Sequence, residues 1–172
     1  MRSNGSIYVS AVFAALVAYF SYQWWFNPHR VVKRRLGEIA ATLSVPESEA
    51  ERGRVTRVAQ LRHYLADDVR VHVARSGGDF ALGSRDAVLA VVGGWMPPPG
   101  GWNVDFVDVD VAVDSSTTAR AYLTADVASR DPRTGERTLD SRDATLSMVN
   151  RDGEWVVSEV DVKEPPTPPS RP

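Results

Sequence analysis

The feature that most constrains this chain is a series of four long runs of alternating apolar and polar residues in its C-terminal half. Only short stretches rich in Ser, Thr, Asp, Gly and Pro separate the runs, and such stretches favour tight turns. Successive side chains of a strand point to opposite faces of a sheet, so each run predicts a half-buried strand. Four strands joined by tight turns predict an antiparallel sheet. The runs span residues 102–114, 118–129, 137–149 and 154–163.

The first of these runs changes phase part-way along. Val104 and Phe106 share one face of the expected strand, whereas Val107, Val109 and Val111 share the other. Such a change predicts a β-bulge, in which one extra residue bends the strand and increases its twist. We therefore expect a strongly curved sheet that forms the wall of a cone with a pocket inside.

Two helical patterns precede the strands. Asn27 followed by Pro28 is typical of a helix N-terminus, with Asn as the cap and Pro at the first helical position. The apolar residues that follow repeat with the spacing of one helical face: Val32, Leu36, Ile39 and Leu43. A second helix is expected from about Glu47 to Leu65. Helices before a run of strands predict an α+β domain, here over residues 28–163, in which helices pack on the curved antiparallel sheet.

A short strand pair and a third helix are expected between these two parts. VRVHVA, which begins at Val69, alternates like a strand, and SGGDFALG predicts a turn with a short partner strand. Ser84 as N-cap and Gly93–Gly94 as the stop predict a helix over SRDAVLAVVGG. Residues 164–172, EPPTPPSRP, contain too much Pro to join a core and predict a disordered or polyproline-like tail.

Residues 6–26 form a run of 21 residues without a charged side chain. A helix rises about 1.5 Å per residue, so this run matches the ~30 Å hydrocarbon core of a bilayer. Tyr and Trp gather at its C-terminal end, where such rings favour the headgroup level. Bulky residues there disfavour the alternative, a cleaved signal peptide. After a short tail, residues 1–5, we therefore expect a single-pass anchor in a bacterial-type inner or plasma membrane.

The basic residues after this run bear on orientation. Arg30, Lys33, Arg34 and Arg35 outnumber the positive charges before it, which favours a cytoplasmic domain by the positive-inside rule. The same residues form the polar face of the following helix, and folded domains can be translocated despite such flanks. These residues therefore do not decide on which side of the membrane the domain lies.

Composition excludes several classes of function. With 20 Lys and Arg against 22 Asp and Glu, the chain has a formal net charge of −2 and no basic stripe for nucleic acid. The absence of Cys excludes disulfides, thiolate metal sites and cysteine nucleophiles. Histidines with metal-ligand spacing and a Gly-rich phosphate loop are also missing, so neither a metal nor a cofactor is expected.

Three motifs resemble the nuclear transport factor 2-like superfamily, which includes ketosteroid isomerase, scytalone dehydratase and SnoaL-type polyketide cyclases. They are YLADDVRVHV (64–73), GSRDAVLAVV (83–92) and NRDGEWVVSEVDV (150–162). The resemblance covers about residues 28–163 and implies a cone-shaped α+β fold, with a lean toward an exocytoplasmic domain. The valine-rich strands are also expected to leave a sheet face that the helices cannot cover, which predicts a homodimer.

The resemblance also implies where catalytic residues belong. Ketosteroid isomerase-like members place a proton-transferring Asp five residues after the second Asp of the acidic pair, and that position is Val73 here. They place an oxyanion-stabilising Tyr on the first helix, but residues 28–43 contain none. Their buried acid in the penultimate strand corresponds to Thr145. The resemblance therefore implies that the isomerase machinery is absent.

Two functions remain open. The first is a membrane-anchored, non-catalytic module that binds an apolar small ligand or a protein partner. The alternative is a SnoaL-like lyase, isomerase or hydrolase with a modified pocket that uses Tyr64, His72 or Tyr122. The pocket candidates are Tyr64, Val71, Val73, Trp95, Tyr122 and Thr145. His72, the alternative catalytic residue, lies on the opposite face of its strand from Val73, and Asp67–Asp68 is interpreted as a turn between helix and strand.

Overall fold

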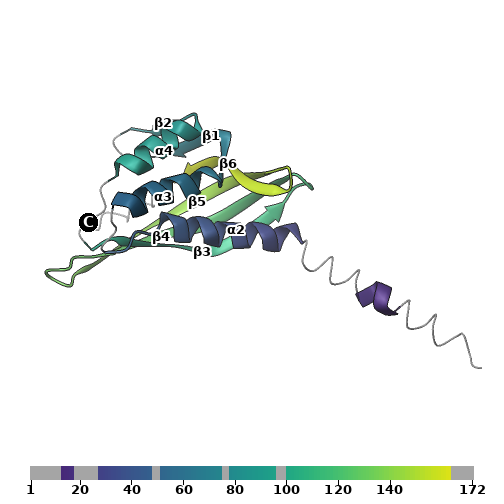
Figure 1. Ribbon diagram of the computed structural model, residues 1–172, viewed down its shortest axis with the longest axis horizontal. Helices are drawn as coiled ribbons and strands as arrows, with labels where there is room; N and C mark the ends of the chain where they lie inside the picture. Colours follow the sequence, from purple (N-terminus) through teal and green to yellow (C-terminus); the bar gives the residue numbers. More distant parts are fainter. Residues whose placement is uncertain (1–12, 18–26, 48–50, 75–77, 96–99, 164–172) are drawn as a thin grey trace, which may run out of the picture.

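Six strands form one curved sheet, and helices cover one of its faces (Figure 1). The structure, a computed structural model, describes residues 13–17, 27–47, 51–74, 78–95 and 100–163. Residues 13–17 are helical. The further elements are α2 (Pro28–Leu43), α3 (Glu51–Arg62), β1 (Leu65–Val73), β2 (Phe80–Leu82), α4 (Arg85–Gly94), β3 (Trp102–Val113), β4 (Thr118–Arg130), β5 (Arg137–Arg151) and β6 (Glu154–Val162).

The sheet is mixed, with the strand order β2-β1-β6-β5-β4-β3. The four long strands pair as antiparallel neighbours, as predicted, but β1 lies parallel to β6. The expectation of a purely antiparallel sheet was therefore wrong. Turn residues reveal which consecutive strands form hairpins, whereas β1 joins a strand that lies far away in the sequence.

The bulge predicted in the first long strand is confirmed. The pairing of β3 with β4 shifts register between Val107 and Asp110. Asp108 has a φ of 50°, a left-handed conformation that Asp tolerates better than most residues. The extra residue lets Phe106 and Val109 both pack against the core on the helix side of the sheet. The bulge therefore adds to the curvature of β3 where it passes under α2 (Figure 1).

Helix α2 begins where the sequence predicts. The Asn27 side-chain oxygen accepts a hydrogen bond from the His29 N–H at 3.1 Å, and Pro28 occupies the first helical position. Val32, Leu36 and Ile39 are buried, which confirms the predicted apolar stripe. The helix lies against β3, and Arg34 is exposed on its outward side.

The second helix is shorter than predicted. Helix α3 ends at Arg62, and β1 begins at Leu65, which pairs with Val157 of β6. Asp67 and Asp68 therefore lie inside a strand and not in the turn before it. Leu65 is buried at the start of β1, and an apolar residue at the end of a helix would be buried as well. Its pairing with β6 is a long-range contact that helical spacing cannot reveal.

The two faces of the sheet differ in chemistry. Small and apolar side chains of β4 and β5 face the helices and are buried: Ala119, Ala121, Leu123, Ala144, Leu146 and Met148. One row of the opposite face carries Asp110, Tyr122, Thr145, Asp161 and His72. That outer face is polar, because the valines beyond the bulge turn toward the core. The expected apolar outer face is therefore not present in the described strands.

Within the described residues, no helix combines the length and the hydropathy needed to cross a membrane. Most of the predicted anchor, residues 6–26, lies outside the described part of the chain, as does the Pro-rich segment 164–172.

Candidate functional site

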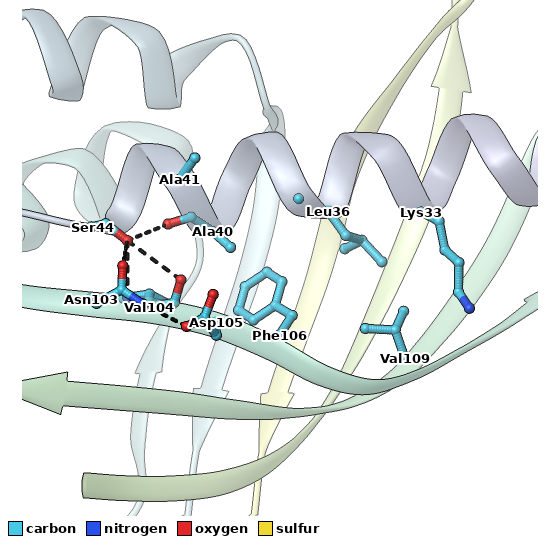
Figure 2. A pocket seen from close by; sticks show the side chains of 11 residues that line it. Lys33, Leu36, Ala40, Ala41, Ser44, Asn103, Val104, Asp105, Phe106 and Val109 are labelled. Carbon is cyan, nitrogen blue, oxygen red and sulfur yellow. Dashed lines mark hydrogen bonds between the residues drawn. The ribbon is translucent and has the colours of Figure 1, made fainter.

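A groove of about 540 Å³ lies between α2 and β3, the edge strand of the sheet. Figure 2 shows the helix on one side of the groove and the strand on the other. The lining residues are Lys33, Leu36, Gly37, Ala40, Ala41, Ser44, Asn103, Val104, Asp105, Phe106 and Val109.

The middle of the groove is apolar. Leu36 contributes from α2, and Phe106 and Val109 contribute from the two sides of the bulge (Figure 2). Gly37 and Ala41 keep the helix wall thin, and a Cβ added at Gly37 would meet no atom within 4 Å. The space exists because α2 carries small residues on the side next to β3.

Polar groups lie at the two ends of the groove. The Ser44 hydroxyl donates to the Ala40 carbonyl at 3.0 Å and accepts from the Val104 N–H at 2.9 Å. Asn103 donates to the Asp105 carboxylate at the same end. Lys33 lies at the other end, beside Val109 (Figure 2), and makes no ion pair with a described residue. The groove is therefore apolar in the middle and polar at both ends.

None of the six pocket candidates predicted from the sequence lines this groove. Val71 and Val73 share one face of β1 and are both partly buried, and Val71 packs against the core. Tyr64 packs under the Arg35 guanidinium, whose carbon lies 4.4 Å from the ring centroid. Trp95 follows α4 as its C-cap and is 59% exposed.

The remaining candidates lie on the outer face of the sheet. Tyr122 and Thr145 are register partners on β4 and β5, and both alternate with buried, helix-facing residues. His72 lies on the same outer face, with its Nε2 3.6 Å from an Asp79 carboxylate oxygen. Tyr64, by contrast, packs against the core. These side chains therefore do not converge on one site.

The acidic pair ties β1 to two other elements. Asp67 forms an ion pair with Arg85 at the start of α4. Asp68 accepts a hydrogen bond from Arg151, at the β5–β6 turn, at 2.7 Å. That hydrogen bond, a backbone hydrogen bond and the charge of Arg151 lower the pKa of Asp68 below its ordinary value. A lowered pKa makes the Asp68 carboxylate a weaker proton acceptor.

A second cavity of about 370 Å³ lies beside this pair. Its lining alternates in charge, with Arg62, Arg85 and Arg151 near Asp67 and Glu154. Two of these arginines already hold the carboxylates of the acidic pair. Arg62 pairs with Asp86, so each of the three arginines is already engaged with a carboxylate.

Groups for proton transfer or metal binding are sparse near the groove. Among the described residues, Arg57 is the only charged side chain that is buried. The same part of the chain contains no group of three or more His, Asp or Glu side chains able to hold a metal ion. The ionisable side chains that line the groove are Lys33 and Asp105.

The sequence did contain one signal for the groove. Gly37, Ala41 and Ser44 follow Lys33 at intervals of four, eight and eleven residues, so they form a stripe beside the apolar face of α2. Small residues along a helix facing an edge strand leave room that larger side chains would fill. The apolar stripe of α2 does not reveal this second face.

Known structures resemble the fold. An NTF2-like protein with a cystatin-like fold from Novosphingobium aromaticivorans matches with a TM-score of 0.65 and 11% identity, over 88% of this chain and 91% of that one. Aln2 from a Streptomyces species matches with a TM-score of 0.61 and 10% identity, over 81% and 91%. The association domain of CaMKII from C. elegans matches with a TM-score of 0.52 and 10% identity, over 78% and 91%.

These similarities define the fold class. The domain has the nuclear transport factor 2-like fold, an α+β arrangement of helices on a curved mixed sheet, as the sequence motifs predicted. No protein-family model matches the sequence, and no curated protein matches it either. Because proteins of one fold carry many unrelated functions, function must be argued from the groove itself.

Proposed function

We propose that this chain is a non-catalytic binding module that holds an apolar small molecule in the groove between α2 and β3. The observation that carries the proposal is the groove's apolar middle with polar groups confined to its ends. Ligand sites are typically concave and mostly apolar, with a few polar groups that set orientation. Lys33 at one end and Ser44 and Asn103 at the other are suited to that orienting role.

The enzyme alternative has weaker support. A lyase, isomerase or hydrolase needs a proton-moving group within hydrogen-bond reach of its substrate. Of the residues considered for that role, Tyr64 lies under Arg35, and His72 and Tyr122 lie on the outer face of the sheet. Val73 occupies the position that corresponds to the isomerase base. A binding function needs no proton-moving group, so it fits the groove better than the enzyme alternative does.

We propose further that residues 6–26 tether this module to a membrane. The support is the uncharged run of 21 residues and its aromatic C-terminal end. Helix α2 begins at Pro28, directly after this run, so the tether would lead into the helix that forms one wall of the groove. A ligand that partitions into membranes would then be concentrated near its binding site.

A homodimer formed through the outer face of the sheet is also proposed. Its support is the similarity of the fold to a domain described as an association domain. Because the outer face is polar, pairing would use hydrogen bonds and ion pairs from residues such as Tyr122 and Arg120. Sedimentation equilibrium of residues 28–163 measures the association directly, and a monomer at high concentration would contradict the dimer.

The groove can be tested by filling it. In residues 28–163, Gly37→Leu would place a leucine side chain in open space at the groove wall without a backbone clash. Binding of N-phenyl-1-naphthylamine, an uncharged apolar fluorophore, is expected to weaken at least about tenfold, which corresponds to about 1.4 kcal/mol. Arg34→Leu is the matched control, because Arg34 lies on α2, is exposed and does not line the groove.

Both variants are checked for folding by thermal melting followed by circular dichroism. Gly37→Leu is expected to melt no lower than the parent, since Leu favours helix more than Gly does. Equal affinity of the fluorophore for the parent and for Gly37→Leu would show that the groove is not the binding site.

A further inference from the structure

Lys33 differs from the other polar side chains that line the groove. It lies at one end of the groove, beside Val109, and is exposed (Figure 2). Glu38, the one acidic residue of α2, pairs instead with Arg34 and Arg35, at 3.7 and 3.3 Å. Among the residues that the structure describes, no carboxylate forms an ion pair with Lys33. Its ammonium group, which has three donors, is therefore available to a ligand.

The polar groups at the other end of the groove are engaged with the protein itself. The Ser44 hydroxyl donates to one backbone group at 3.0 Å and accepts from another at 2.9 Å. The Asn103 amide donates to the Asp105 carboxylate. Asp105 also gives this end a negative charge, which disfavours an anion. An anionic group of a ligand therefore belongs at the Lys33 end.

The apolar middle of the groove connects the two ends over a defined length. Ser44 follows Lys33 by eleven residues of α2 and its cap, which corresponds to about 16 Å along the helix. Leu36 and Phe106 line the space between them, and Gly37 leaves the helix wall open there (Figure 2). A single extended alkyl chain matches this length and lining.

We propose, on the basis of the binding function proposed above, that the ligand is a single-chain amphiphile with a carboxylate head group, as in a fatty acid. The head group pairs with the Lys33 ammonium, and the alkyl chain runs along α2 toward Ser44. A hydrogen bond between an ammonium and a carboxylate is charge-assisted. Because Lys33 is exposed, the pair stays in contact with water and avoids the cost of full desolvation.

The test compares two ligands with the same chain length, decanoate and 1-decanol, as competitors of N-phenyl-1-naphthylamine. Residues 28–163 are suited to it, because the buried side chains of the core cluster lie between Val32 and Val157. At a pH well above the pKa of the fatty acid, decanoate should displace the fluorophore at about fivefold lower concentration than decanol, the effect of one exposed ion pair. Added NaCl should reduce this difference, because salt screens exposed charges.

Three variants locate the head group. Lys33→Met keeps a long unbranched side chain without the charge, so the dissociation constant of decanoate should rise about fivefold and that of decanol should stay unchanged. Arg34→Met removes the same charge from the next residue, which does not line the groove, and should alter neither ligand. Asp105→Asn should also leave decanoate binding unchanged, because about 16 Å exceeds the ~8 Å screening length at physiological ionic strength. Thermal melting checks the folding of each variant.

Equal affinities of decanoate and decanol for the parent, or an unchanged decanoate affinity in Lys33→Met, would overturn the assignment of the head group. Tighter decanoate binding in Asp105→Asn would place the carboxylate at the opposite end and overturn it as well. In either case, displacement of the fluorophore by decanol, weakened in Gly37→Leu, would still support the groove as an apolar binding site. Absence of fluorophore and decanol binding to the parent would overturn the binding function and this inference together.

Discussion

At the scale of single residues, Asp68 joins parts of the chain that lie far apart in the sequence. Its hydrogen bond to Arg151 spans 83 residues and connects β1 to the β5–β6 turn. Asp67 makes the corresponding connection to Arg85 on α4. The pair therefore positions β1 against two neighbouring elements through exposed ion pairs, which are each worth little but are specific in geometry.

The lowered pKa of Asp68 has a defined consequence for pH. A carboxyl whose pKa is lower in the folded than in the unfolded chain stabilises the fold above the unfolded value, and this contribution is lost as pH falls through the folded pKa. We expect Arg151→Gln to raise the titration midpoint of Asp68 toward its ordinary value. Carboxyl ¹³C NMR between pH 2 and pH 6, about the range in which Asp titrates, measures this change.

Asp114 provides the matched control for that experiment. Its pKa is lowered by a hydrogen bond from Arg120, on a different part of the sheet. Arg151→Gln should leave the midpoint of Asp114 where it is. An unchanged Asp68 midpoint in the same variant would show that the ion pair does not form in solution.

Single residues also show what sequence can and cannot predict about the site. The alternation of side chains along a strand places His72 and Val73 on opposite faces, and the structure has them so. The partners of Asp67 and Asp68 could not be predicted, because Arg85 and Arg151 come close only once the sheet and α4 are assembled. The family resemblance implies a pocket position for Thr145, but strand alternation places Thr145 and its register partner Tyr122 on the outer face.

At the scale of elements, the apolar stripe and the N-cap predict where α2 begins and which side it buries. The bulge in β3 could likewise be predicted, because an extra residue in one strand changes the phase of its alternating run. The parallel pairing of β1 with β6 was not readable, since no turn chemistry joins two strands so far apart. The groove forms only when α2 and the bulged β3 are packed together in the folded domain. From the sequence, only the small residues of α2 indicate it.

A substitution at Gly37 tests the helical backbone of α2 separately from ligand binding. It lies inside α2, and a Cβ there would meet no atom within 4 Å. Gly37→Ala is therefore expected to raise the free energy of unfolding by about 0.5–1 kcal/mol, because Ala loses less backbone freedom on folding into a helix. Urea denaturation of residues 28–163 measures the difference.

Gly153→Ala is the contrasting control. Gly153 lies in the turn between β5 and β6 with a φ of 90°, a conformation that L side chains rarely adopt. The same substitution should therefore lower the free energy of unfolding there, although space is available around it. A decrease for Gly37→Ala as well would mean that α2 does not have the regular helical backbone described here.

At the scale of the whole molecule, the groove lies apart from the region where most buried side chains pack. Buried side chains fill the space between the helices and β4, β5 and β6, whereas the groove lies at the edge strand beside α2. The proposed tether leads into that same helix from its N-terminal end. A ligand arriving from a membrane would therefore meet first the end of the groove that carries Lys33.

The proposed membrane tether leads to a prediction for the full-length protein. Residues 6–26 are uncharged over a spanning length, so the full-length protein is expected to stay in the membrane fraction through alkaline carbonate washing. Replacing Phe13 and Leu16 by Arg places two charges near the middle of the run, at a cost of about 2.5–3.5 kcal/mol each on insertion scales. This double variant should shift toward the wash, and substituting Arg at Ser3 and Asn4, outside the run, should not. Full-length parent protein in the wash would contradict anchoring, and a released protein shorter by the mass of the run would identify a cleaved leader in its place.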